Sequence, residues 1–276
     1  MPQARNNAAR WDQRIGRAEE LAATYPFASQ ILSFYAEIAS FQKSLLEGVK
    51  AASGNGADRQ SDLTFQESLD VVPLLPRFPD LLSLVERVGT PVLAGAAQEL
   101  KAEDPSYWED LLSYYWKAEA HVVADAPETH LFFARAFLQP YAELVAGRKG
   151  LELPRLGDPL CPVCSGKPLV GVLREEGHGA RRSLVCSLCL TEWNYRRIVC
   201  PACGEDRFEK LASYAASQFE HVRVEACETC KTFINTVDLT KNGLAIPEVD
   251  ELACLPLSLW AKENGYTKLQ PNLLGI

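Results

Sequence analysis

The chain has 276 residues, of which 47% are hydrophobic and 23% are charged, and this composition is typical of a soluble globular protein with one large core or two smaller ones. Its net charge of −8 argues against a nucleic-acid-binding protein, because a polyphosphate partner needs a basic face. No run is long and apolar enough to span a membrane, and the N-terminal stretch MPQARNNAARWDQRIG contains neither an apolar signal core nor a twin arginine. We therefore expect a cytoplasmic protein without membrane insertion.

The first half of the chain, residues 1–153, has no cysteine and carries patterns typical of helices. One apolar stripe recurs at helical spacing, formed by Ile31, Phe34, Tyr35, Ile38 and Phe41. The polar run 53–62 predicts a solvated loop. The run 71–79, VVPLLPRFP, is broken by prolines and predicts an extended connector.

Shorter helices are expected after this connector. One should end at Gly89, and the next two should begin at Thr90 and Asp104, which are capping residues that each precede a proline. The run 126–147 is also helical in pattern, with Pro140 expected to kink or split it. The aromatic runs 113–119 and 130–137 are typical of a core. Together these patterns predict an irregular all-helical domain of five to seven helices.

The pattern changes after a hinge at Pro154, Gly157 and Pro159. Four short runs are β-like, at 168–176, 181–186, 193–200 and 221–227. After Asp238 the tail is again helical in pattern. Its apolar face should pack on the sheet region or the helical half and contains Leu252, Leu255, Leu259 and Trp260.

Eight of the nine cysteines fall in four CxxC pairs, and these pairs form a duplicated unit. The pair Cys161-Pro-x-Cys164 matches Cys200-Pro-x-Cys203, and RSLVCSLCLTEWN (182–194) matches RVEACETCKTFIN (223–235). A unit of about 40 residues is therefore used twice.

The duplication predicts which sulfurs share an ion. Each unit begins with a CPxC turn, passes through a hairpin and ends with a CxxC turn, and two such turns complete a closed tetrahedron of thiolates. We therefore predict one metal ion on Cys161, Cys164, Cys186 and Cys189, and a second on Cys200, Cys203, Cys227 and Cys230.

Four thiolates suit zinc and mononuclear iron equally, so the residues leave the metal open. The spacings do not match ferredoxin runs, and a reduced cytoplasm argues against structural disulfides. None of the pairs has the strand-to-helix setting of a thioredoxin-like redox motif. A structural role is expected for the ions, with electron transfer or redox sensing by a rubredoxin-like iron as one alternative and zinc-ribbon binding of nucleic acid as another.

The remaining reactive side chains have plain interpretations. His178 is expected at a solvated hairpin tip, His121 and His130 on helices, and His221 before a strand where it could lie near the second metal. Cys254 is expected to be a small apolar residue in a helix. The sequence has no Ser/His/Asp set, P-loop, GxGxxG or HExxH, so no catalytic residues are assigned and no enzyme activity is expected.

The layout of the whole chain resembles the FdhE family of formate dehydrogenase accessory proteins. The segments that carry the resemblance are GDPLCPVCSGKPLVGVL (157–173), SLVCSLCLTEWNYRRIVCPACG (183–204), VEACETCKTFINTVDL (224–239) and VDELACLPLSLWAKENGY (249–266). The resemblance implies a cytoplasmic protein that contacts the catalytic subunit of a respiratory formate dehydrogenase, a molybdenum enzyme, before its export. It also implies rubredoxin-like iron on the eight paired cysteines, which favours iron over zinc.

The expected fold is therefore a multidomain α+β protein. A helical domain (1–153) precedes two tandem rubredoxin-like or zinc-ribbon modules (154–198 and 199–245), and a C-terminal helical tail follows (246–276). The oligomeric state is left open, including a homo-oligomer, and so is the surface that docks the partner.

Overall fold

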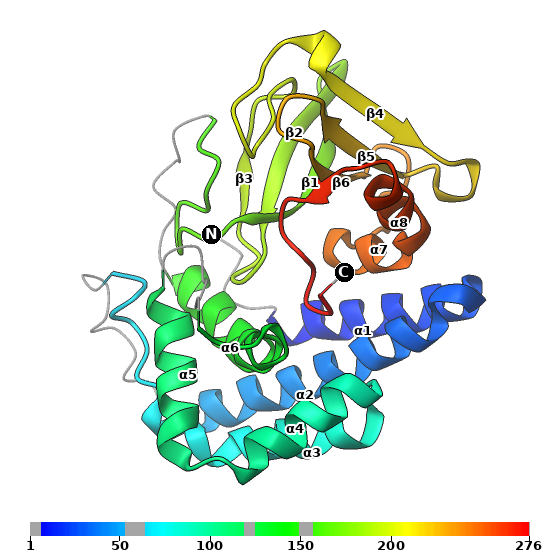
Figure 1. Ribbon diagram of the computed structural model, residues 1–276. Coiled ribbons are helices and arrows are strands. Elements are labelled where there is room, and N and C mark those ends of the chain that lie inside the picture. Colours follow the sequence, from blue (N-terminus) through cyan, green and yellow to red (C-terminus); the bar gives the residue numbers. More distant parts are fainter. Residues whose placement is uncertain (1–6, 53–63, 119–124, 149–156, 276) are drawn as a thin grey trace.

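The computed structural model describes residues 7–52, 64–118, 125–148 and 157–275. Within these ranges a helical half, blue to green in Figure 1, lies beside one mixed β-sheet, and two more helices follow most of the sheet in sequence. This confirms the predicted class, with a helical N-terminal region, a sheet region that holds both cysteine groups, and a helical C-terminal segment. The domain boundaries stay a prediction. The polar run 53–62, His121 and Pro154 lie outside the described residues.

Six α-helices precede the first strand in the described ranges, together with two 3-10 helices. The α-helices are α1 (Asn7–Thr24), α2 (Ser29–Ala52), α3 (Phe78–Val88), α4 (Pro91–Ala102), α5 (Pro105–Lys117) and α6 (Glu128–Arg148). The 3-10 helices are η1 (Pro26–Ala28) and η3 (Val72–Arg77). The predicted extended connector at 71–79 is therefore wrong: the fixed φ of proline also fits a tight helical turn, and η3 leads directly into α3.

The predicted helix ends are confirmed. The Thr90 side chain accepts a hydrogen bond from the N–H of Leu93 (3.4 Å), and the Asp104 carboxylate accepts one from the N–H of Ser106 (2.9 Å). Gly89 follows the last residue of α3. These side chains satisfy backbone donors that the first helical turn leaves unpaired.

Pro140 lies inside α6 and does not split it. A proline has no N–H, so the carbonyl of Ala136, four residues earlier, lacks its usual helical donor. Gln42 on α2 supplies the missing bond: its Nε2 donates to the Ala136 carbonyl oxygen at 2.7 Å. The side chain of a neighbouring helix thus compensates for the proline.

The two cysteine units supply six strands of one seven-stranded sheet, and the C-terminal segment supplies the seventh. Its strands are β1 (Pro168–Glu176), β2 (Gly179–Cys186), β3 (Glu192–Asn194), β4 (Leu211–Ala215), β5 (Val222–Cys227), β6 (Thr232–Asp238) and β7 (Thr267–Lys268). Their order is β3-β2-β1-β6-β5-β4, with β7 paired to β6. Strand β3 is shorter than the predicted run 193–200, because the chain leaves β2 after Asn194 and crosses to the first cysteine turn of the second unit.

The duplicated units lie side by side in the same orientation. Unit one contributes β3-β2-β1 and unit two β6-β5-β4, and the two meet where β1 pairs in parallel with β6. At this seam Gly171 lies opposite Thr236, and a Cβ at Gly171 would be 2.4 Å from the Thr236 Oγ1. Glycine therefore permits the close approach of the two units.

The C-terminal tail packs on both halves, as the sequence predicted, but it forms two helices: α7 (Pro247–Ala253) contacts α1, α2, β1 and β6, and α8 (Leu255–Glu263) contacts β5 and β7. Cys254 is buried at the junction of these helices rather than inside one. Leu259, expected on the apolar face, is 47% exposed. Burial of Trp116, Phe133 and Phe137 confirms the aromatic core.

The main core is shared between the helices and the first cysteine unit. It contains helical residues such as Trp116 and Phe137 together with Leu184 and Trp193 of the sheet. A second core lies between the sheet and α8 and includes Val224 and Leu257. No described helix is both long enough and apolar enough to cross a bilayer.

We predict that Gly171→Ala lowers the free energy of unfolding by about 1–3 kcal/mol, because the added methyl group collides with Thr236 at the seam. Chemical denaturation followed by circular dichroism measures this change. Gly179→Ala is the matched control, since a Cβ at Gly179 meets nothing within 4 Å. The loss should shrink in a Thr236→Ala background, and an equal loss in both backgrounds would contradict the proposed collision.

Candidate metal centres

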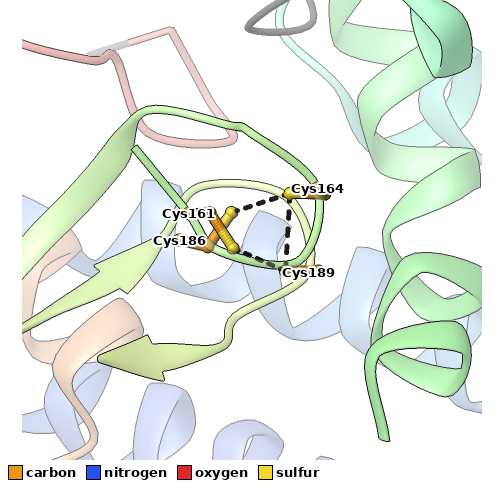
Figure 2. Close-up of side chains that lie close together, drawn as sticks. All are labelled: Cys161, Cys164, Cys186 and Cys189. Atoms are coloured by element: carbon orange, nitrogen blue, oxygen red, sulfur yellow. Dashed lines mark hydrogen bonds between the residues drawn. The ribbon is translucent and has the colours of Figure 1, made fainter. Parts of the chain in front are cut away.

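The four sulfurs of the first unit converge at one point. Cys161 and Cys164 come from the turn before β1, and Cys186 and Cys189 from the turn between β2 and β3; Figure 2 shows their side chains pointing toward one another. The Sγ–Sγ distances are 3.3 Å for Cys164–Cys186, and 3.5 Å for Cys161–Cys189 and Cys164–Cys189. These values are too long for a disulfide and close to the edge of about 3.8 Å in a tetrahedron with metal–sulfur bonds of about 2.3 Å.

The second unit repeats this arrangement. The Sγ–Sγ distance is 3.7 Å for Cys200–Cys230 and also for Cys203–Cys227. All four sulfur atoms of each group lie within 4.8 Å of one another, and all nine cysteines are free thiols. The structure therefore brings together the two sets that the duplication predicted. Their role as metal ligands stays a prediction, which the chemistry of four convergent sulfurs fits.

All four cysteine turns share one unusual backbone position. The residue directly after the second cysteine has a positive φ in each: Ser165 (60°), Leu190 (52°), Gly204 (77°) and Lys231 (55°). Three of these four residues are not glycine, and the left-handed conformation costs a residue with a Cβ about 1–2 kcal/mol. Among the described residues, Ser165, Leu190 and Lys231 are the non-glycine positions with positive φ. This conformation reverses the chain so that both sulfurs of a turn face one point.

Backbone hydrogen bonds hold each turn closed. In the first unit the N–H of Ser165 donates to the Cys161 carbonyl (2.9 Å), and in the second the N–H of Gly204 donates to the Cys200 carbonyl (3.0 Å). The N–H of Ala202 also points at the Cys200 Sγ (3.4 Å). Such N–H groups stabilise negative charge on sulfur and so suit a thiolate that binds a metal.

The two centres differ in their exposure. All four cysteines of the first are at most 3% exposed, whereas in the second Cys203 is exposed and Cys230 is half-buried. Helix α6 covers the first centre: the guanidinium of Arg135 donates to the Ser187 carbonyl, within the Cys186–Cys189 turn, at 3.0 Å. The first centre is therefore enclosed by the helical half, and the second faces solvent.

Burial makes the free thiols hard to ionise. It raises the pKa of Cys189 in the first centre and of Cys200 in the second. At Cys230 burial acts in the same direction, but hydrogen bonds from Thr232 and Cys203 outweigh it and lower the pKa to about 7. A cation is the natural partner that would keep four such sulfurs ionised together, since metal binding displaces their protons.

The three histidines within the described residues lie apart from both centres. His178 is exposed at the β1–β2 hairpin tip, as predicted, and His130 in α6 is buried with its Nδ1 2.9 Å from the Tyr107 hydroxyl. His221 precedes β5 and is separated from Cys227 by about 20 Å of extended chain. Its Nε2 lies 2.8 Å from an oxygen of Asp250, so the interpretation that it lies near the second centre is wrong.

A charge cluster that the sequence did not predict lies between the units. Arg182 on β2 and Arg223 on β5 occupy equivalent positions of the duplication, and both reach Glu225, each at 2.7 Å. Strands β2 and β5 are separated by β1 and β6, so this contact shows that the sheet is curled across its face. The equivalence of the two arginines was visible in the repeat, but their convergence needs the sheet order.

Comparison with known proteins gives one consistent family. The model of the FdhE central domain matches residues 160–197, and that of the FdhE C-terminal domain matches residues 198–274. A protein named Protein FdhE homolog from Aquifex aeolicus (strain VF5) is 29% identical over 277 residues, which cover 95% of this chain and 94% of that protein. A Protein FdhE homolog from Shewanella oneidensis is 37% identical over 117 residues, which cover 42% of this chain and 38% of that protein.

One solved structure has the same fold over nearly the whole chain. It is the crystal structure of the FdhE protein from Pseudomonas aeruginosa, with a TM-score of 0.69 and 24% sequence identity. The match covers 96% of this chain and 95% of that chain. The helical half, the curled sheet and the C-terminal helices therefore form one recurring fold.

The positive φ after each cysteine turn can be tested by exchanging serine and glycine in both directions at Ser165 and Gly204. Ser165→Gly should raise the free energy of unfolding by about 1 kcal/mol, since glycine adopts a positive φ without cost, and Gly204→Ser should lower it by a similar amount. Denaturant titration of the metal-loaded protein measures both. Ser217→Gly, at an exposed position without positive φ, should be destabilising or neutral. Stabilisation by Ser217→Gly equal to that by Ser165→Gly would show that the backbone conformation is not the cause.

The difference in exposure predicts two phases of metal release. A chelator should remove the ion at the second centre at least tenfold faster than the ion at the first, because Cys203 is exposed and the first centre is covered by α6. Release of zinc from the zinc-loaded protein, followed with a colorimetric chelator, measures both rates. Cys203→Ser should abolish the fast phase and leave the slow one. A single phase that accounts for both ions would contradict the assignment.

Proposed function

The chain belongs to the FdhE family, and on that premise we propose that it is an accessory protein of a respiratory formate dehydrogenase, which binds the catalytic subunit in the cytoplasm before export. The observation that carries the proposal is the pair of four-cysteine centres within a chain that a Protein FdhE homolog matches over 95% of its length. The sequence similarity identifies the family, and the two centres support the surface that we expect to bind the catalytic subunit.

The centres suit a structural role better than a catalytic one. Each places four protein sulfurs around one point, which fills a tetrahedral ion and leaves no position for a substrate. A catalytic zinc keeps an open position for water or substrate. We therefore propose that the protein is not an enzyme and that Cys161, Cys164, Cys186, Cys189, Cys200, Cys203, Cys227 and Cys230 bind two ions that fold its docking surface.

Metal binding should supply much of the folding free energy of the second unit. Strand β4 lies at the edge of the sheet, and its exposed residues include Ser213 and Ala215. A structural four-thiolate site contributes on the order of 10 kcal/mol to folding. Iron is favoured by the family resemblance, and zinc fits the same donors. With iron, the exposed Cys203 would place any exchange of electrons at the second centre.

Loss of one metal-ligating cysteine should therefore weaken binding of the partner. Cys203→Ala should lose one ion per chain, unfold the second unit and lower capture of the formate dehydrogenase catalytic subunit at least tenfold in a pull-down from cell extract. Elemental analysis and a visible spectrum of the same samples give the metal content and separate iron from zinc. Capture of precursor, but not of exported mature subunit, tests binding before export.

Cys254→Ala is the matched control, because Cys254 is buried outside both centres and should leave two ions and full capture. If Cys203→Ala protein holds one ion, keeps its circular dichroism and still captures the subunit at the control level, the structural role of the second centre is wrong. If the unaltered protein captures no subunit, the proposed function itself fails.

A further inference from the structure

A pocket of about 220 Å³ lies against the face of β4, β5 and β6 that α8 leaves uncovered. On β5 the side chains alternate: Val224 belongs to the core beneath α8, while Arg223, Glu225 and Cys227 line the pocket. The opposite wall is the segment 197–202, which enters the second metal centre. The pocket is therefore built at the contact between the two units and adjoins the second centre.

The inner end of the pocket holds a cluster of two guanidinium groups and one carboxylate. Arg182 and Arg223 both bind the single carboxylate of Glu225, and all three line the pocket. Arg182 is 3% exposed, and its Nε has no hydrogen-bond partner among the described residues. Burial opposes ionisation of Glu225, but the two arginines outweigh it and hold its pKa below its ordinary value. One carboxylate thus faces two guanidinium groups, one of which has a buried donor left over.

A third arginine lies at the opening. Arg197 is exposed, donates to the Ala180 carbonyl at 3.0 Å, and has no carboxylate partner in the described part of the chain. The lining therefore contains three arginines and one glutamate. An acidic group at this opening would gain a charge-assisted hydrogen bond from Arg197, which is exposed and has no carboxylate partner in the described part of the chain.

The opening is also apolar. Phe208 is 74% exposed and Ile198 is 47% exposed, and both line the pocket. Phe233 and Ile234 are buried deeper in the lining. Exposed aromatic and aliphatic side chains around a preformed hollow are typical of a site that receives an apolar side chain.

The rim follows an unpaired strand edge. Strand β4 pairs with β5 and with no second strand among those described, and its residues Leu211, Ala212 and Ser213 line the pocket. The free backbone groups of such an edge pair readily with an extended peptide. This edge favours a polypeptide over a small molecule as the occupant.

We propose that this pocket binds an extended segment of a partner polypeptide that inserts one apolar side chain between Phe208 and Ile198 and places a neighbouring acidic side chain at Arg197. The site rests on the proposed function in that it gives the catalytic subunit a docking point. Cys200 and Cys227 line the pocket, so a folded second centre is required for binding.

The test needs no knowledge of the partner's sequence. Random 12-residue peptides displayed on phage are selected on the full-length metal-loaded protein, and enriched sequences are made as fluorescent peptides. The expected consensus is an apolar residue within a few positions of Asp or Glu. The Kd of such a peptide should rise about tenfold in Phe208→Ala and in Arg197→Glu, as expected for the loss of an anchor or a charge pair at an interface.

Matched controls use equally exposed positions elsewhere. Val92→Ala removes a 69% exposed apolar side chain on α4, and Arg10→Glu reverses an exposed charge on α1; neither should change the Kd. The inference is overturned if no acidic–apolar consensus appears, if the two pocket variants bind as the unaltered protein does, or if decanoate displaces the peptide and binds with equal affinity, which would make the ligand a small apolar acid.

The outcomes separate this inference from the proposed function. If the unaltered protein captures the catalytic subunit and both Phe208→Ala and Arg197→Glu capture it equally, docking at the pocket is wrong while the accessory function stands. If peptides bind at the pocket but the subunit is never captured, the pocket stands and the proposed client is wrong.

Discussion

Helix α7 joins the two halves of the molecule through buried charges, and the relative placement of everything else depends on it. Glu248 accepts a hydrogen bond from Arg14 of α1 at 2.7 Å, and Asp250 accepts one from Arg17 of α1 at 2.6 Å. Arg14 and Asp250 are each 1% exposed. Removing one partner of such a pair costs about 3–5 kcal/mol, because the remaining charge is left buried and alone. The pairs therefore fix the position of the sheet on the helices, where apolar packing alone would permit sliding.

The same helix also reaches the sheet and the end of the chain. Asp250 binds His221 before β5, and the buried carboxylate of Glu251 contacts Lys268 of β7 and the side-chain amide of Asn235 on β6. One short helix, α7, thus contacts the helical half, the sheet and the C-terminal segment through Glu248, Asp250 and Glu251. The second cysteine unit has little core of its own near β4. Contacts with α7 hold one face of this unit in place, while its opposite face stays uncovered.

Local features were predictable from the sequence, and long-range ones were not. The duplication grouped the eight paired cysteines as the structure does, and Thr90 and Asp104 marked helix starts through short-range hydrogen bonds. The parallel pairing of β1 with β6 has no local signal, since it joins residues 65 positions apart such as Gly171 and Thr236. For the same reason the convergence of Arg182 and Arg223 on Glu225 could not be predicted from the sequence, and neither could the pocket that these residues line. The predicted split of the helix at Pro140 is absent, and the sequence could not show why, because the compensating donor, Gln42, lies on another helix.

The burial of the first centre imposes an order on how the protein is made. Its four sulfurs are enclosed once Arg135 of α6 bonds to the Ser187 carbonyl, although α6 leaves the ribosome before any of these cysteines. A cation that is to occupy this centre must arrive after the cysteines are synthesised and before the helices close over them. The second centre can bind a cation after folding is complete, because Cys203 remains at the surface in the folded protein. Metal supply during synthesis would thus decide the occupancy of the first centre for much longer than that of the second, which could be filled, emptied or exchanged throughout the life of the protein.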